Sequence, residues 1–265
     1  MPEYTFRVLA LRWTATALFI ACIPLFLVLT NVRIAANWER VYDYAFAQYD
    51  VPDVTGIERP ELDRSAREIV RYFQSSERNE LLDIRVQRGE DTIPLFNQRE
   101  ILHMQDVRDL FLLVNRIHEF ALVYIVGYVA AVYLWSRERS MRRLAREAIT
   151  AGVVTVAILG VGAVAMMLGF DTLFEQFHLL SFSNDFWQLN PATDRLVQMF
   201  PNGFWFDVSL AVGVFTILQG GLVALAGLGY IIYADREEER RRLQRRRRRV
   251  AAAPAVDPAP EPPGA

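Results

Sequence analysis

The chain carries three histidines, and two of them lie where an imidazole can take part in acid–base chemistry. His103 lies in the stretch NQREILHMQDV. If this stretch is helical, Glu100 and Asp106 share a face with His103, and so does Arg99, because residues three and four apart are neighbours on a helix. A carboxylate that accepts a hydrogen bond from one ring nitrogen fixes the tautomer of the imidazole and leaves the other nitrogen free to act as a base. A plain solvated charged helix face has the same spacing, so the pattern alone leaves both interpretations open.

His178 lies in the stretch FEQFHLLSFSNDFWQLNP, which connects two long apolar segments. This connection is rich in aromatic rings, whereas an ordinary loop is small and polar. Asn184, Asp185 and Asp194 follow it closely in the sequence. Taken alone, a histidine in such a place is more often an interfacial polar residue than a catalyst, so its role depends on what lies near it in space.

Other catalytic patterns are missing from the sequence. There is no GxSxG elbow of a serine hydrolase, and HEFAL at His118 lacks the second histidine of HExxH, so we interpret His118 as structural. The one cysteine, Cys22, lies in an apolar segment without an activating neighbour. A zinc site built from His103, His178 and an aspartate is an alternative, because two histidines and a carboxylate form a known catalytic set. Our expectation is that neither a metal nor a cofactor is required.

Four long apolar segments must position these residues, at 13–32, 117–135, 149–170 and 206–233. A helix that crosses a bilayer needs about 20 mostly apolar residues, and each segment reaches or approaches that length. We therefore predict a mainly α-helical membrane protein with four transmembrane helices. The first segment could instead be a cleaved signal peptide, but its apolar stretch is long for one and no clear cleavage site follows it.

Arginine is distributed unevenly around these segments. Arg7 and Arg12 precede the first, 136–148 is an arginine-rich loop after the second, and 234–265 begins with a dense arginine run after the fourth. Basic segments next to a span stay in the cytoplasm, so we expect a multi-pass cell-membrane protein with both termini inside. The run 245–249 is expected to bind anionic lipid headgroups, and the Pro- and Ala-rich end of the tail to be disordered. Nothing in the charge pattern indicates a nucleic-acid partner.

Two segments then lie outside the cytoplasm, the domain 33–116 with His103 and a loop rich in aromatic residues, 171–205, with His178. The first is long enough for a small α+β domain above the bundle. GIERPELDRSAREIVRYFQSS predicts a helix with Pro60 in its first turn, and LLDIRVQRGED predicts a strand that ends in a turn. The helical period of NQREILHMQDVRDLFLLVNRIHEF continues into the second span. Because both histidines are on the same side, they can meet above the bundle.

The stretches LFNQREILHMQDV and FHLLSFSNDFWQLNPATDRLVQMFPNGFW resemble the bacterial integral membrane proteins that include lipoprotein intramolecular transacylase. The resemblance covers residues 97–205. It implies transfer of the sn-2 acyl chain of a diacylglyceryl-cysteine to the α-amino group of that cysteine, which gives a lyso-form lipoprotein. It also implies that His103 and His178 are the functional histidines and that a diacylated lipoprotein is the substrate.

The attacking group would be an amine with an ordinary pKa of about 7.7–8.0, which must lose a proton as it attacks. We assign His103 as the base because of its acidic neighbours, and His178 as oxyanion donor and acid, although the two roles could be exchanged. The expected supporting residues are Arg99, Asp106, Asn184, Asp185 and Asp194. A lipid-facing aromatic wall is expected to keep water out, formed by Phe177, Phe182, Trp187, Phe200 and Trp205.

Two rival functions use the same residues differently. An acyl hydrolase acting on a lipid or lipoprotein would use the histidine pair with water, and its product would lose the mass of one acyl chain. A non-catalytic lipid-binding membrane protein would depend on the aromatic rings and not on the histidines. A transporter is disfavoured, because no span has an ionisable residue near its middle.

Overall fold

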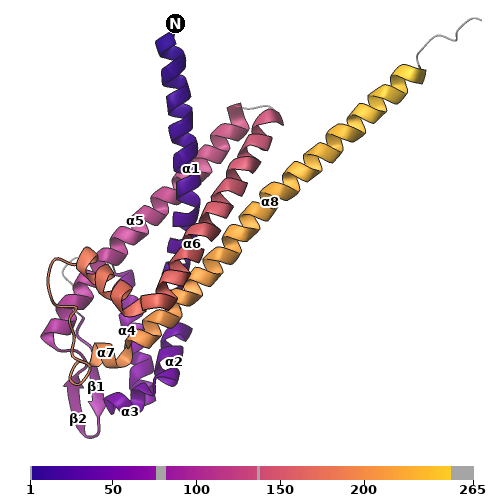
Figure 1. The fold of residues 1–265 in the computed structure, drawn as a ribbon. Helices are drawn as coiled ribbons and strands as arrows, with labels where there is room; N and C mark the ends of the chain where they lie inside the picture. The colour runs from indigo at the N-terminus through magenta and orange to yellow at the C-terminus, as the bar shows by residue number, and fades with distance from the viewer. Residues whose placement is uncertain (1, 76–81, 136–137, 252–265) are drawn as a thin grey trace, which may run out of the picture.

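The computed structural model describes residues 2–75, 82–135 and 138–251. Four long helices cross one another and spread apart at one end, and a smaller region is gathered at the other end (Figure 1). The elements in chain order are α1 (Pro2–Asn37), α2 (Glu39–Gln48), α3 (Val51–Thr55), α4 (Arg59–Gln74), β1 (Arg85–Arg88), β2 (Asp91–Pro94), α5 (Gln98–Trp135), α6 (Glu138–Ser181), α7 (Arg195–Met199) and α8 (Asn202–Ala251).

Within the described residues, four helices are long and apolar enough to cross a membrane: Leu9–Asn37, Gln98–Leu134, Met141–Ser181 and Asn202–Arg248. This confirms the predicted mainly helical fold with four candidate membrane helices. A helix of 37 residues is about 55 Å long, whereas the hydrocarbon core is about 30 Å thick. Only part of each helix can therefore lie in the bilayer. The predicted apolar stretches 13–32, 117–135, 149–170 and 206–233 each lie within one of the long helices α1, α5, α6 and α8. Each of these helices is longer than its apolar stretch.

Helices α6 and α8 pack closely because small residues face each other. A Cβ atom added at Gly152 would lie 2.4 Å from the carbonyl oxygen of Gly220, and one added at Gly220 would lie 2.8 Å from the side chain of Thr155. Lipid tails are as apolar as the helix surfaces, so close van der Waals packing and polar contacts must hold membrane helices together. One such contact joins α1 to α8, where the Asn31 amide donates to Thr216 and Gln219.

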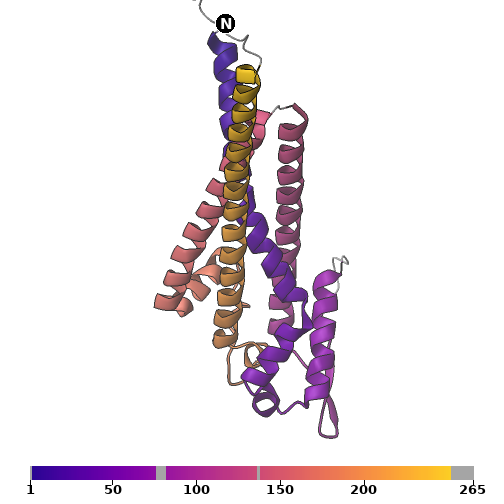
Figure 2. The ribbon, with the colours of Figure 1, turned by 90° about the vertical axis from the view of Figure 1, so that its right-hand side faces the viewer.

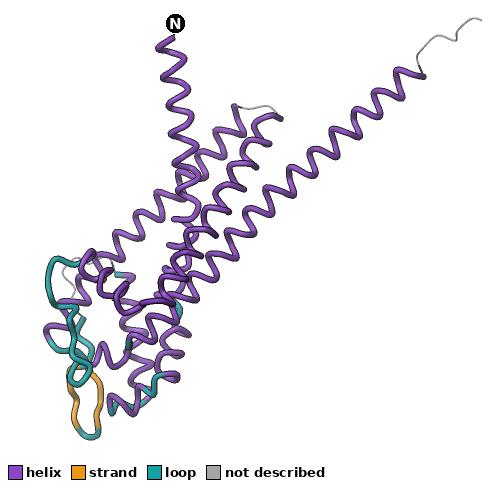
Figure 3. The backbone as a smooth tube through the Cα atoms, in the orientation of Figure 1, coloured by secondary structure: helices purple, strands orange, loops and turns teal. Residues whose placement is uncertain are grey.

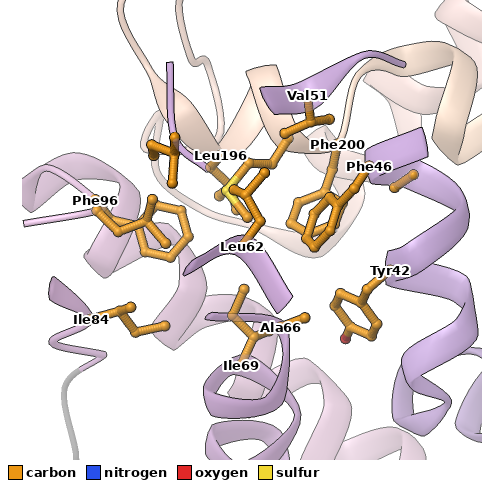
Figure 4. Packing of buried hydrophobic residues seen from close by; sticks show 14 of the residues in the cluster. Tyr42, Phe46, Val51, Leu62, Ala66, Ile69, Ile84, Phe96, Leu196 and Phe200 are labelled. Atoms are coloured by element: carbon orange, nitrogen blue, oxygen red, sulfur yellow. The ribbon is translucent and has the colours of Figure 1, made fainter. Parts of the chain in front are cut away.

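The smaller region comprises residues 38–75, 82–97 and 182–201, and we call it the head. Its core joins α2, α4, the hairpin and α7 around apolar side chains (Figure 4). Helix α4 has Pro60 in its first turn, and its stripe of Leu62, Ala66 and Ile69 is buried. Strands β1 and β2 pair antiparallel, with Gly89 in the left-handed conformation (φ 65°) at the turn. This hairpin is the whole sheet in the described part of the chain.

Three segments predicted as loops or tails are largely helical. Helix α6 begins at Glu138, inside the predicted loop 136–148, and it ends at Ser181, so His178 lies on a helix and not in a loop. Helix α8 continues to Ala251 through the arginine-rich segment. Arginine and glutamate are good helix formers, and ion pairs such as Glu238–Arg242 stabilise the exposed turns. The helices therefore continue through these polar segments, although the predicted spans ended where the apolar residues end. The Pro- and Ala-rich segment 252–265 lies outside the described residues.

The close α6–α8 contact predicts different outcomes for two glycines of the same helix. Gly152→Ala should lower stability by about 1–3 kcal/mol, because the added methyl group meets the α8 backbone. Gly162→Ala is the matched control, since nothing lies within 4 Å of a Cβ atom there. Thermal unfolding in detergent micelles should show a lower Tm for the first variant only. Equal Tm values for the two variants would contradict the packing.

Candidate active site

The two histidines meet at the junction of the head and the bundle. His103 lies on the second turn of α5, and His178 lies on the last turn of α6, beyond a break at Gly169 (φ −174°, ψ 63°). The centres of the two rings are 6.0 Å apart, and each residue is only 7% exposed. Two consecutive membrane helices therefore bring together residues that are 75 positions apart in the sequence (178 − 103).

A backbone hydrogen bond orients the ring of His178. Its Nδ1 atom lies 2.7 Å from the carbonyl oxygen of Phe174, one helical turn earlier. A carbonyl oxygen only accepts, so Nδ1 carries the proton, and in the neutral ring Nε2 has the free lone pair. His178 is thus presented as a proton acceptor through Nε2. The role of Phe174 was not predicted, because the stretch was expected to be a loop, which lacks the i−4 carbonyl contacts of a helix.

The environment of His178 is a cage of aromatic rings. The ring centres of Phe174, Phe177, Phe182 and Trp187 lie 4.3, 5.3, 5.6 and 5.0 Å from that of His178. Phe182 also meets His103 edge-on, at 5.3 Å. The predicted aromatic surroundings of the histidines are therefore present, and they exclude water from much of the surface of both rings.

His103 is not oriented by its acidic neighbours, contrary to the sequence-based assignment. Its Nδ1 atom is buried and has no hydrogen-bond partner among the described residues. The Glu100 carboxylate instead accepts from the backbone N–H groups of Asn97 (2.7 Å) and Leu196 (2.6 Å). It joins the start of α5 to the start of α7, because a buried carboxylate must satisfy its lone pairs. The reason for choosing His103 as the base is therefore wrong.

Asp106 and Arg99 contact the segment that follows α6. The Asn184 amide donates to Asp106 at 2.8 Å, and the Arg99 guanidinium donates to the backbone carbonyl of Asp185. The Asn184 side chain also accepts from the N–H of Phe186, which closes a turn. Four of the predicted supporting residues thus join α5 to one loop, and this loop lies beside the start of α5 in Figure 3.

Asp194 has a different place, in the head. Its carboxylate accepts from the Asn97 amide at 3.0 Å and from the backbone N–H of Asn190 at 2.7 Å. It therefore orders the turn before α7 and the residue before α5. Its contacts are with the frame of the site and not with either imidazole.

The predicted lipid-facing wall is divided in the structure. Phe177 is 50% exposed and Trp205 is 40% exposed, while Phe182 and Trp187 lie against the histidines. Phe200 is only 6% exposed and packs with Tyr42 in the core of the head, so it is not part of such a wall. Phe200 follows α7 directly, and its side chain points into the core of the head.

Burial determines the charge of both imidazoles. His103 and His178 lie outside the apolar stretches 117–135 and 149–170 that are expected to cross the bilayer. Burial, with a smaller contribution from the neighbouring His178, lowers the pKa of His103 from 6.5 to about 4. Burial also lowers the pKa of His178, and the hydrogen bond to Phe174 opposes this shift in part. Both rings are therefore mainly neutral at pH 7, so each has one nitrogen that can accept a proton and one N–H that can donate.

The alternative zinc site has no ligand set in the structure. In the part of the chain that the structure describes, no three His, Cys, Asp or Glu side chains are placed to hold a metal ion. The nearby aspartates are engaged elsewhere, Asp106 with Asn184 and Asp194 in the turn before α7. A ligand set of two histidines and an aspartate is therefore not assembled among the residues that the structure describes.

The sequence and the fold both have counterparts among known proteins. Residues 17–205 match the family model described as lipoprotein intramolecular transacylase Lit. The match covers well over half of the chain and includes both histidines. The chain belongs to this family. The matched range of this chain includes the motifs around His103 and His178, and the family is that of a membrane acyltransferase, as the resemblance of these motifs implied.

Individual relatives are distant. An uncharacterized protein from Aquifex aeolicus is 25% identical over 138 residues, and the match covers 50% of this chain and 56% of that protein. The chain thus spans little more than half the length of that relative. The crystal structure in meso of the membrane integral lipoprotein intramolecular transacylase Lit from Bacillus cereus is 16% identical, with a TM-score of 0.66, and covers 86% of this chain and 99% of its own. A variant of that protein with one histidine replaced by arginine has a TM-score of 0.67. At this identity the likeness shows a shared fold.

The lowered pKa of His103 predicts how its charge changes with acidity. Because the pKa is lowered, the neutral form should persist as the pH falls below the ordinary value of 6.5, and protonation should reach its midpoint only near pH 4. Histidine-selective NMR of the protein in detergent measures this directly, with a His103→Gln variant to assign the signal. A midpoint near 6.5 for His103 would contradict the buried, uncharged site.

Proposed function

We propose that this protein is a lipoprotein intramolecular transacylase that moves the sn-2 acyl chain of a diacylglyceryl-cysteine to the α-amino group of the same cysteine. Membership of the family supports this, and the observation that carries it is the pair of neutral imidazoles 6.0 Å apart within aromatic rings. No side-chain nucleophile of the protein is needed, because the substrate supplies its own amine. Holding the amine and the ester together gives the rate advantage of an intramolecular reaction.

In the proposed reaction, Nε2 of His178 takes a proton from the amine as the nitrogen attacks the ester carbonyl carbon. The hydrogen bond from Nδ1 to Phe174 supports this role, because it leaves Nε2 as the acceptor. General-base assistance of this kind typically contributes about 10²–10⁴ in rate. His178 thus takes the base role that the sequence had assigned to His103.

His103 is proposed to donate its N–H to the oxyanion of the tetrahedral intermediate. A neutral imidazole offers one N–H, and a donor in a dry site stabilises developing charge more strongly than in water. When the intermediate collapses, the C–O bond to glycerol breaks and the proton held by His178 passes to that oxygen. The products are an amide on the cysteine nitrogen and a free glycerol hydroxyl, which together are the lyso form.

The site is proposed to lie at the outer surface of the cell membrane, with both chain termini in the cytoplasm. The distribution of arginine supports this orientation, because Arg7 and Arg12 and the C-terminal run lie at the ends of α1 and α8 that are remote from the head (Figure 2). A diacylated lipoprotein is anchored by its acyl chains with the cysteine at the interface. The exposed rings of Phe177 and Trp205 suit contact with such chains.

The test is to express the protein in a host that makes only diacylglyceryl lipoproteins and to analyse the N-terminal lipopeptide by tandem mass spectrometry. We expect an N-acylated lyso form with the protein, and a loss of at least about 10²-fold in its formation with His103→Ala or His178→Ala. His118→Ala is the matched control, since His118 contacts Thr30 and Arg33 instead of the site.

The mass of the product separates the candidates. Transfer conserves the mass of the lipopeptide, whereas an acyl hydrolase removes one chain. A normal lyso form from both site variants would contradict the mechanism. Unchanged diacylglyceryl peptide from well-expressed protein would contradict the function and favour a non-catalytic lipid-binding role.

We also propose that the arginine run binds anionic lipid headgroups. Residues 245–248 are exposed on the helical extension of α8, and each arginine near a charged surface contributes about 1 kcal/mol. Replacing Arg245–Arg248 with glutamine should reduce the anionic lipid that copurifies with the protein, measured by lipid mass spectrometry, without changing lyso-form production. Equal lipid content in the two proteins would rule the proposal out.

A further inference from the structure

The segment at 182–187, which we call the aromatic loop, is tied to α5 on both sides of His103. Arg99 lies four residues before His103 on the helix and donates to the carbonyl of Asp185. Asp106 lies three residues after His103 and accepts from Asn184 at 2.8 Å. Residues at these spacings share one helix face, so the same face presents the imidazole and holds the loop.

The aromatic loop supplies two of the rings that enclose the histidines. Phe182, at its start, meets His103 at 5.3 Å and His178 at 5.6 Å. Trp187, at its end, lies 5.0 Å from His178. Between them, the Asn184 side chain accepts from the N–H of Phe186, so the same amide that binds Asp106 also shapes the turn that leads to Trp187.

Few other polar contacts hold the aromatic loop. Over the residues that the structure describes, its hydrogen bonds to side chains of the rest of the protein are those with Asp106, which accepts, and with Arg99, which donates. The chain beyond the loop is fastened separately, through Asp194 and through Glu100, which bind the turn before α7 and α7 itself. Loss of the Asp106 contact can therefore loosen the aromatic loop while the rest of the head stays assembled.

We propose that the hydrogen bond between Asp106 and Asn184 holds the aromatic loop closed over the two histidines, and that this closure decides whether the substrate amine or water attacks the acyl ester. Asp106 and Asn184 are positioning residues, because they act through the rings of the loop. The inference rests on the proposed transacylase function. It adds the device that would keep the same histidine pair from working as a hydrolase.

The two competing reactions differ only in the attacking group. In transfer, the amine nitrogen bonds to the carbonyl carbon, the C–O bond to glycerol breaks, and the amine proton passes through His178 to the glycerol oxygen. In hydrolysis, a water oxygen bonds to the same carbon, the same bond breaks, and one water proton passes by the same path, which releases a fatty acid. A base that can accept from the amine can also accept from water, so selectivity depends on excluding water.

The experiment measures the partition between the two products. Asp106→Ala and Asn184→Ala should raise the ratio of deacylated to N-acylated lipopeptide by about tenfold, the size expected when a hydrogen bond to a charged group is lost. Gln87→Ala is the matched control, because it removes an amide hydrogen bond to Thr92 in the hairpin. The lipopeptide and the released fatty acid are both quantified by mass spectrometry.

An exchange of the two residues tests the contact itself. The double variant Asp106→Asn with Asn184→Asp restores an amide–carboxylate pair in the opposite direction, and an aspartate at 184 can still accept from Phe186. We expect its product ratio to return close to that of the unmodified protein. Rescue is not expected if the single variants merely destabilise the head.

Each result leads to a decision. A raised ratio in both single variants with rescue by the exchange supports the inference. An unchanged product ratio in the single variants would overturn the inference, and so would an exchange variant that hydrolyses as much as the single variants do. In either case, lyso form made by the unmodified protein would still support the proposed transacylase function. Failure of the unmodified protein to make any lyso form would overturn both.

Discussion

Burial of the two imidazoles among aromatic rings is the constraint on which the rest of the site depends. It keeps both rings uncharged, and it lowers the pKa of His103 to about 4. A neutral pair can act as proton acceptor and N–H donor only if each ring is oriented, and for His178 the Phe174 carbonyl does this. The aromatic loop that follows α6 contributes to this burial, because its rings Phe182 and Trp187 lie against the two imidazoles.

The frame that makes this burial possible is divided between the bundle and the head. Small residues bring α6 and α8 into close contact, and the far end of α6 carries His178 beyond the break at Gly169. The head is fastened to α5 by the Glu100 carboxylate, which binds the start of α7. These contacts carry no chemistry of their own, but together they place two rings from consecutive helices 6.0 Å apart.

Much of this architecture was predictable. The four spans follow from hydrophobic length, and the structure has four helices of that kind. The predicted continuation of the His103 helix into the second span corresponds to α5. The placement of His178 in a loop was wrong, because the polarity and aromatic content of the segment conceal a helix that runs to Ser181. Phe200 was placed on the lipid face although it packs in the head, since an aromatic residue near an interface has the same composition in either place.

The sequence by itself determined the class of the protein, the residues available for chemistry and the family, because long apolar runs and unusual motifs are local properties. It also identified Asp106, Asn184, Arg99 and Asp185 as neighbours of the site. Only the tertiary structure decided what these residues bind. Glu100 and Asp106 have the right spacing to orient His103, yet their carboxylates bind Leu196 and Asn184, which lie 96 and 78 residues away along the chain. A buried carboxylate takes whatever donors the fold brings to it, and helical spacing cannot specify partners from distant segments.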